Sequence, residues 1–339
     1  MELIMNNLNV IWFILLCVLF AGFFFLEGFD YGTGILLPVI GKTDVERRQM
    51  INALGPIWDG NEVWMITAGG ALFASFPHVY ATLFSGFYMA LFLMLAVLII
   101  RGVAFEFRSK SPNRTWRKVF DYCIFIGSIV PALLWGVTVG NLIQGTPIDE
   151  TMTYVGTFWD LLSPYTVLCG VAFILVFTYH GGLFTSLKTA GPVSERARAA
   201  ALVTGVPTAI GVIALIIASY VCTDLYNSTL AIVFCALAVV CFLISWGATR
   251  TRNTKWGFLF SSLSIILITA TYFAGLFPRI MVSSLNPAWS LTITNTSSSE
   301  YTLALMTAVA AVFVPIVLAY QIWVYWIFRH RVTEKDLHY

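Results

Sequence analysis

The sequence has little charge and few long polar stretches. Asp, Glu, Lys and Arg make up 11% of its 339 residues, whereas hydrophobic residues make up 59%. A typical soluble domain carries roughly 25% charged residues, so this chain lacks the polar surface that a soluble domain needs. The polar stretches are also too short for a second domain, and we predict one membrane domain over residues 1–339. The net charge of +2 is too small to indicate a nucleic-acid partner.

The sequence also lacks the usual signatures of a metal or cofactor site. Its six cysteines form no C-x-x-C pair, and it has no Walker loop, dinucleotide fingerprint or zinc motif. The four histidines are His78, His180, His330 and His338, and no two of them lie four residues apart on one helix. We therefore predict no metal site. Packing roles are the favoured interpretation of His78 and His180, and a lone axial haem ligand is the alternative.

The sequence is rich in apolar segments that are long enough for membrane helices. A spanning helix needs about 20 mostly apolar residues, because the hydrocarbon core is about 30 Å thick. We therefore predict an all-α, polytopic membrane protein with about nine transmembrane helices. Their expected ranges are 8–36, 54–76, 79–100, 120–142, 164–186, 199–222, 229–248, 256–277 and 303–328.

The loops between these segments divide by charge. All but one of the 19 Lys and Arg residues follow the odd-numbered segments, and only Arg279 follows an even-numbered one. Short loops rich in Lys and Arg stay in the cytoplasm, so we predict that the N-terminus lies outside and the C-terminus inside. A wrong number of helices would break this alternation. The pattern therefore supports the predicted number as well as the orientation.

Most acids lie in loops, where solvation explains them, but two pairs of carboxylates lie in the first two predicted membrane helices. Glu27 and Asp30 come near the end of the first segment, and Asp59 and Glu62 open the second. Residues three apart share a helix face. The predicted orientation places both pairs in the cytoplasmic half of the membrane, together with Arg101 at the end of the third segment. An ionised side chain at mid-bilayer costs at least about 2.5–3.5 kcal/mol, so such residues persist where something requires them.

One arginine cannot neutralise four carboxylates. Burial and like-charge repulsion favour the protonated form of a carboxyl, so we expect at least one of the four to accept and pass on a proton near neutral pH. Ion pairs that fix helix packing, or a position in the interfacial layer, are the alternatives. Proton handling is favoured most for Asp59 and least for Asp30, whereas Arg101 is expected to be a structural counter-ion.

Several stretches carry a family likeness. They are residues 27–34 (EGFDYGTG), 46–52 (ERRQMIN), 56–74 (PIWDGNEVWMITAGGALFA) and 84–88 (FSGFY). Together they strongly resemble subunit II of cytochrome bd-type quinol oxidases. The likeness spans nearly the whole chain and is most specific over residues 24–111.

The resemblance implies a function in a respiratory complex of the bacterial plasma membrane. In that family a larger subunit I carries the haems and the catalytic residues, and the complex oxidises quinol and reduces dioxygen to water. Subunit II provides a proton path from the cytoplasm that begins at Asp59, and it can hold a structural quinone. The resemblance leaves open whether a small accessory subunit joins.

Other residues are expected to take part in the proton path. Glu27, Glu62 and Asp30 are expected to lie along it, although relatives can carry an amide or an aspartate where this chain has Glu27 and Glu62. Trp58, Asn61, Arg101 and Glu106 are expected to support it.

Two other functions fit the residues alone. A proton-coupled secondary transporter would use buried acids and Gly-rich packing, but transporter sites usually lie near the midplane between repeated halves, and no clear repeat is present. An assembly scaffold without a proton role is the third possibility. In a scaffold, replacing any of the acids would cost only stability.

Overall fold

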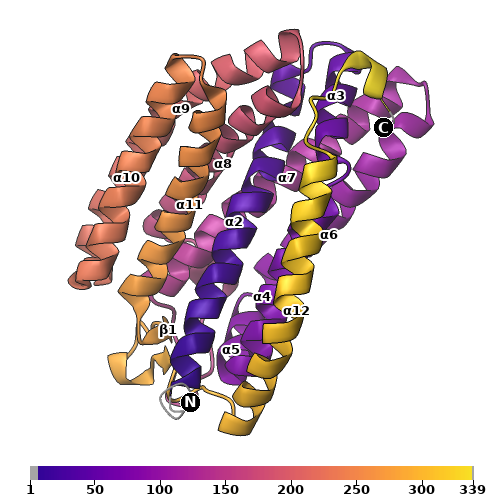
Figure 1. Ribbon diagram of the computed structural model, residues 1–339. Coiled ribbons are helices and arrows are strands. Elements are labelled where there is room, and N and C mark those ends of the chain that lie inside the picture. The colour runs from indigo at the N-terminus through magenta and orange to yellow at the C-terminus, as the bar shows by residue number, and fades with distance from the viewer. Residues whose placement is uncertain (1–6, 338–339) are drawn as a thin grey trace.

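The computed structural model describes residues 7–337 and forms a bundle of helices (Figure 1). This arrangement confirms the predicted all-α class. A small antiparallel sheet of β1 (Arg279–Met281) and β2 (Leu291–Thr292) lies at one end. The α-helices are α2 (Leu8–Ile40), α3 (Asp44–Leu54), α4 (Trp58–Ser75), α5 (Pro77–Gly86), α6 (Tyr88–Phe107), α7 (Arg114–Gln144), α8 (Pro164–Lys188), α9 (Pro192–Cys222), α10 (Thr229–Arg250), α11 (Thr254–Leu276) and α12 (Glu300–Ile327).

The described residues contain eight helices that are long and apolar enough to cross a bilayer, namely α2 and α6–α12. The remaining predicted span, residues 54–76, corresponds to α4. Its 18 residues rise about 27 Å, which is close to the thickness of the hydrocarbon core. Its polar first turns, which contain Asp59 and Glu62, lower its hydropathy. With α4 the bundle agrees with the predicted set of about nine spans.

The predicted helix over 79–100 is divided into two helices, α5 and α6. The chain turns at Phe87 (φ −97°, ψ 14°), next to Gly86. A Cβ on Gly86 would lie 2.6 Å from a ring carbon of Tyr154 in the α7–α8 loop, so this loop occupies the space beside the turn. The apolar run continues through the turn, which explains why hydropathy alone predicted one helix.

Helix α2 is the centre of the bundle. It packs against α4, α7, α8, α11 and α12, and its crossing with α8 is very close. A Cβ on Gly32 would lie 1.8 Å from the carbonyl oxygen of Phe177, and one on Gly181 would lie 2.3 Å from the backbone of Gly32. Glycine at both positions lets the two backbones approach.

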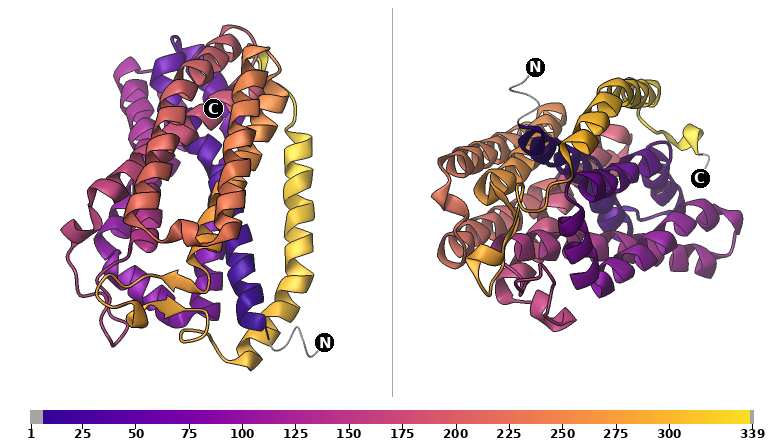
Figure 2. Two further views of the ribbon diagram at one scale, coloured as in Figure 1. Left: turned by 90° about the vertical axis from the view of Figure 1, so that its left-hand side faces the viewer. Right: turned by 90° about the horizontal axis from the view of Figure 1, so that it is seen from below.

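Helix α12 lies at the edge of the bundle, against α2 and α4. Figure 2 shows it standing apart from the other helices, and every residue from Ala311 to Tyr320 is exposed. After α12 the chain crosses to the α8–α9 loop, where the backbone N–H of Val332 donates to the carbonyl oxygen of Lys188 (2.7 Å). The peripheral helix is thus fixed at its C-terminal end.

The start of α2 and the end of α12 lie at opposite ends of the bundle (Figure 1), as an odd number of spans requires. The end that carries the C-terminus also carries α3, which the hydropathy pattern did not predict. A capping box begins α3, because Thr43 accepts from the N–H of Glu46 and the Glu46 carboxylate accepts from the N–H of Thr43. Partial burial raises the pKa of Glu46, but hydrogen bonds from Arg196 and from the backbone hold this pKa below its usual value.

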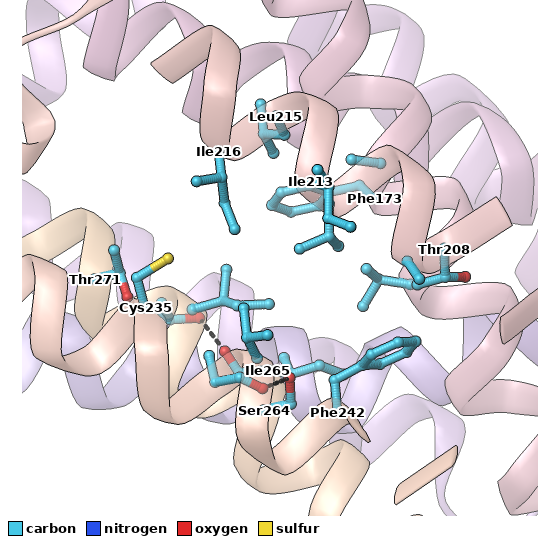
Figure 3. Close-up of a pocket in the computed structure, with 18 of the residues that line it drawn as sticks. Phe173, Thr208, Ile213, Leu215, Ile216, Cys235, Phe242, Ser264, Ile265 and Thr271 are labelled. Carbon is cyan, nitrogen blue, oxygen red and sulfur yellow. Dashed lines mark hydrogen bonds between the residues drawn. The ribbon is translucent and has the colours of Figure 1, made fainter. Parts of the chain in front are cut away.

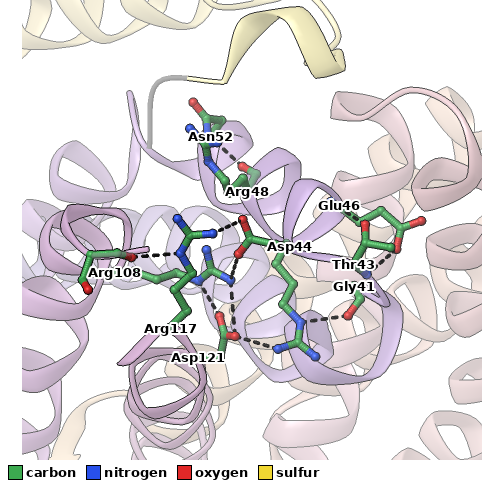
Figure 4. A network of polar contacts seen from close by, with 11 residues as sticks. Gly41, Thr43, Asp44, Glu46, Arg48, Asn52, Arg108, Arg117 and Asp121 are labelled. Atoms are coloured by element: carbon green, nitrogen blue, oxygen red, sulfur yellow. Dashed lines mark hydrogen bonds and ion pairs between the residues drawn. The ribbon is translucent and has the colours of Figure 1, made fainter. Parts of the chain in front are cut away.

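A network of ion pairs fixes α3 to the ends of α6 and α7 (Figure 4). Arg108, which is buried, donates to Asp121 (2.6 Å) and to Asp44 (3.0 Å). Asp121 also accepts from Arg47 (2.6 Å), and Asp44 accepts from Arg117 (2.7 Å). Asp121 lies near the start of α7 and is only 2% exposed, so arginines rather than water balance its charge.

Candidate proton-transfer site

A buried ion pair joins α2 to α6. Arg101 Nη1 donates to Glu27 Oε1 at 2.5 Å, and both side chains are almost completely buried. The guanidinium also stacks against two rings, with its Cζ 4.9 Å from the centre of Tyr31 and 5.3 Å from that of Phe105. Gly127 of α7 makes this position possible, because a Cβ there would lie 2.5 Å from Arg101 Cβ. The predicted counter-ion role of Arg101 agrees with this geometry.

Asp30 lies beside this pair and is fully buried. Its Oδ2 accepts a hydrogen bond from Asn61 Nδ2 at 2.8 Å, and it lies three residues after Glu27 on the same face of α2. Glu27 and Asp30 are two fully buried acids beside one cation, Arg101, and this charge balance suits them to hold a proton.

The structure does not bring all four predicted carboxylates together. Glu27 and Asp30 are fully buried, but Glu62 is half-buried and Asp59 is exposed on α4. Glu62 lies within electrostatic range of both Arg101 and Asp59. The four acids thus form a series from the surface to the interior, and the expectation of a single shared dry pocket is wrong for Asp59.

The predicted supporting residues also differ in burial. Asn61 is buried and contacts Asp30, as described above. Trp58 packs against Phe105, with ring centres 5.3 Å apart, and so fills the space between α4 and α6. Glu106 is exposed on α6 and takes no part in the buried cluster.

Polar atoms in the cluster retain unused hydrogen-bonding capacity. Glu27 Oε2, Asp30 Oδ1 and Tyr31 OH are buried without a partner among the described residues, and so are Nε and Nη2 of Arg101. Leaving a buried polar group unpaired costs about 1–3 kcal/mol, so several such groups in one place call for an explanation such as a function. Donors and acceptors occur together here, so the cluster is suited to exchanging protons.

Tyr31 and Tyr325 are residues of this site that the sequence analysis missed. Tyr325 OH donates to Asn61 Oδ1 at 2.7 Å, although the two residues are 264 positions apart in the chain. In the sequence Tyr325 resembles an interfacial aromatic residue near a helix end, and no local signal distinguishes it. Tyr31 belongs to the EGFDYG stretch and directly follows Asp30 in the sequence. Its position there does not indicate a contact with Arg101.

The buried histidine does not have the environment of a haem ligand. His180 Nδ1 lies 2.8 Å from Ser261 Oγ, and its Nε2 lies 3.2 Å from the carbonyl oxygen of Phe25. Its ring stacks on Phe258 at 4.8 Å. Both ring nitrogens are therefore engaged. His78 is exposed, and His338 lies outside the described residues. Among residues 7–337, no three His, Cys, Asp or Glu side chains form a metal-binding group.

An apolar cavity of about 660 Å³ lies between α2, α4, α5, α6, α7 and α11. Small-molecule sites typically measure about 300–1,000 Å³ and contain a few polar anchors. Trp135 lines this cavity, and its indole Nε1–H is buried without a partner in the part of the chain that is described. The cavity is thus an apolar space whose lining includes a residue with an unused hydrogen-bond donor.

A second cavity, of about 130 Å³, lies between α8, α9, α10 and α11 (Figure 3). Several hydroxyl groups line it, and many of them already have partners: Ser264 Oγ donates to the carbonyl oxygen of Ala238, and Thr271 Oγ1 donates to that of Leu267. The remaining surface is apolar. An engineered cavity of about 150 Å³ holds a benzene ring, so this cavity is too small for a larger ligand.

The fold and the buried charges define a polytopic membrane protein with a cluster of buried acids around one arginine. Comparison with known proteins identifies the family. Residues 8–328 match the family model of cytochrome bd terminal oxidase subunit II, and the chain belongs to this family. This membership agrees with the resemblance found in the sequence and decides against the transporter hypothesis.

Individual relatives support the same assignment. The chain is 40% identical over 334 residues to cytochrome bd ubiquinol oxidase subunit 2 of Bacillus subtilis, covering 98% of this chain and 99% of that one. It is 40% identical over 365 residues to cytochrome bd-I ubiquinol oxidase subunit 2 of Escherichia coli K12, covering 97% and 96%. Its fold is also similar to a chain in the structure of bd oxidase from Geobacillus thermodenitrificans, with a TM-score of 0.76, 17% identity and coverage of 95% and 98%.

Proposed function

We propose that this chain, as subunit II of a cytochrome bd-type quinol oxidase, carries protons from the cytoplasm toward the oxygen-reducing site of its partner, subunit I. The complex is a terminal respiratory oxidase, and its substrates are quinol and dioxygen. The observation that carries the proposal is the series of acids from exposed Asp59, through half-buried Glu62, to the fully buried Glu27–Asp30 pair. The expected setting of the complex is the bacterial plasma membrane.

The proposed path has three steps. Asp59 takes a proton at the end of the bundle that carries α3, which is predicted to face the cytoplasm. Glu62 is within electrostatic range of both Asp59 and Arg101, and it relays the proton inward. The Glu27–Asp30 pair then holds it, and Arg101 limits the excess negative charge that burial would otherwise make costly. The proton leaves this pair toward subunit I.

The exposed face of α4 is suited to contact with subunit I. Asp59, Gly60, Val63, Thr67 and Gly70 are all exposed along this helix. A carboxylate, a hydroxyl and two glycines are poor neighbours for lipid tails, whereas small and polar residues are typical of helix–helix contacts in membranes. We therefore place the partner over this face, with the haems in subunit I.

We expect Gly60→Leu to weaken assembly with subunit I. A Cβ on Gly60 meets nothing within 4 Å, so this chain tolerates the larger side chain, but a tightly packed partner would not. Overpacking costs about 1–3 kcal/mol, which predicts at least about fivefold less haem co-purifying with this chain. Gly247→Leu on α10 is the matched control, because its Cβ is equally free. Equal haem content in both variants would show that α4 does not contact subunit I.

The 660 Å³ cavity is the proposed site of a structural quinone. Its apolar lining suits an isoprenoid tail, and the unpartnered Nε1–H of Trp135 would donate to a quinone carbonyl oxygen. The 130 Å³ cavity is too small for the ring and tail together. The quinone would stabilise the subunit there without taking part in the proton path.

We expect Trp135→Phe to lower the quinone content of the purified oxidase. The phenyl ring keeps most of the apolar contact but removes the donor, and leaving a buried carbonyl unpaired costs about 1–3 kcal/mol. The quinone extracted per haem should fall by about fivefold or more. Trp159→Phe is the control, because Trp159 is 75% exposed. An unchanged quinone content in Trp135→Phe would rule out this site.

A further inference from the structure

Helix α12 contacts the buried carboxylates through a single hydrogen-bonded chain. Tyr325 OH donates to Asn61 Oδ1 (2.7 Å), and Asn61 Nδ2 donates to Asp30 Oδ2 (2.8 Å). Asn61 is completely buried, and so is Asp30. A helix at the edge of the bundle thus supplies the hydrogen bond that pairs the oxygen of the Asn61 amide.

The orientation of this amide matters because its two ends differ. Its oxygen only accepts hydrogen bonds, and its nitrogen only donates them. While the Tyr325 hydroxyl donates to the oxygen, the nitrogen faces Asp30 and stabilises the ionised carboxylate. In the reverse orientation the amide oxygen would face Asp30, and that arrangement is favourable only when Asp30 is protonated.

We propose that Tyr325 is a positioning residue of the proton path, which holds the Asn61 side chain in place to donate a hydrogen bond to the ionised Asp30 carboxylate. This inference rests on the proposed proton-carrying function. Without the phenolic hydroxyl the buried amide oxygen of Asn61 is unpaired, so the Asn61 side chain is free to turn away from Asp30, and the hydrogen bond that stabilises the ionised Asp30 carboxylate is weakened. The charged and titratable groups that face Asp30 are Glu27 and Tyr31 of α2, Glu62 of α4, Arg101 of α6 and Tyr325 of α12.

The simpler function for Tyr325 is to hold α12 against α4. A second contact between these helices separates the two functions. Trp64 Nε1 of α4 donates to Gln321 Oε1 of α12 at 2.9 Å, one helical turn from Tyr325. Removing either contact loosens α12 from α4 in a similar way, but only the Tyr325 contact continues to a carboxylate.

The test compares Tyr325→Phe with Gln321→Met in the whole purified oxidase. Oxygen consumption at saturating quinol is measured across pH and expressed per haem, so that differences in assembly are removed. One hydrogen bond is worth about 1 kcal/mol, and a pH unit corresponds to about 1.4 kcal/mol. We expect the acidic limb of the pH–rate profile of Tyr325→Phe to shift to higher pH by about 0.5–1 pH unit. The profile of Gln321→Met should be unchanged.

Asn61→Leu provides the second test. This variant also removes the donor to Asp30, so it should shift the profile in the same direction. Adding Tyr325→Phe to it should give no further shift, because the two residues act through one chain. Equal losses in Tyr325→Phe and Gln321→Met without a shift, or additive shifts in the double variant, would overturn the inference. A different result would contradict the proposed proton path itself: an Asp59→Asn oxidase that turns over at the unaltered rate.

Discussion

The Asp59→Asn oxidase is expected to consume oxygen at least about tenfold more slowly than the unaltered enzyme, with its haem content unchanged. Asparagine keeps the size and polarity of the side chain but cannot carry a proton. Positioned proton donors and acceptors typically contribute about 10²–10⁴-fold to a rate, and water near the exposed end of α4 can replace part of this contribution. Oxygen consumption per haem is the measurement.

Glu195→Gln is the matched control for this variant. Glu195 is also an exposed carboxylate at the end of the bundle predicted to face the cytoplasm, and it pairs with Arg198 at 3.2 Å. It lies on α9, on the surface and outside the series of acids. Its replacement should leave turnover unchanged. If Asp59→Asn consumes oxygen at the control rate, Asp59 is not the entry residue.

The Arg101→Met oxidase is expected to assemble poorly. Methionine retains the apolar contact with Tyr31 and Phe105 but leaves Glu27 and Asp30 buried without a cation. Breaking a buried ion pair by removing one partner costs about 3–5 kcal/mol, which is a large part of the stability of a typical domain. The yield of detergent-stable complex and its midpoint of thermal unfolding are the measurements.

Neutralising Glu27 in the same chain distinguishes charge from packing. The double variant Glu27→Gln, Arg101→Met removes both charges, so it should recover much of the yield that the single variant loses. If the double variant is as unstable as Arg101→Met alone, the guanidinium acts through its packing. In that case, the ion pair is not the source of the stability.

The membrane topology could be predicted from the sequence because it depends on local properties. Apolar length and the positions of Lys and Arg are sufficient for the number of spans, and the capping box at Thr43 and Glu46 could also have revealed α3. The division at Phe87 was not predictable in this way. It depends on Tyr154, which comes from a loop more than sixty residues further along the chain and packs beside Gly86.

The candidate site was predictable only in part. The spacing of Glu27 and Asp30 correctly placed both on one buried face of α2. The same spacing for Asp59 and Glu62 could not show that one is exposed and the other half-buried, because exposure depends on which helices flank α4. Tyr325 and Asn61 meet only after α12 returns to α4, so a contact across 264 residues has no local signal.

The side of the membrane from which the protons are taken tests the central claim most directly. The oxidase is reconstituted in vesicles of known orientation, and a pH indicator in each compartment follows proton uptake while quinol is oxidised. We predict that the protons consumed in reducing dioxygen disappear from the compartment facing α3 and the C-terminus, and that Asp59→Asn slows this uptake. Uptake from the compartment facing β1 and β2 would contradict the account.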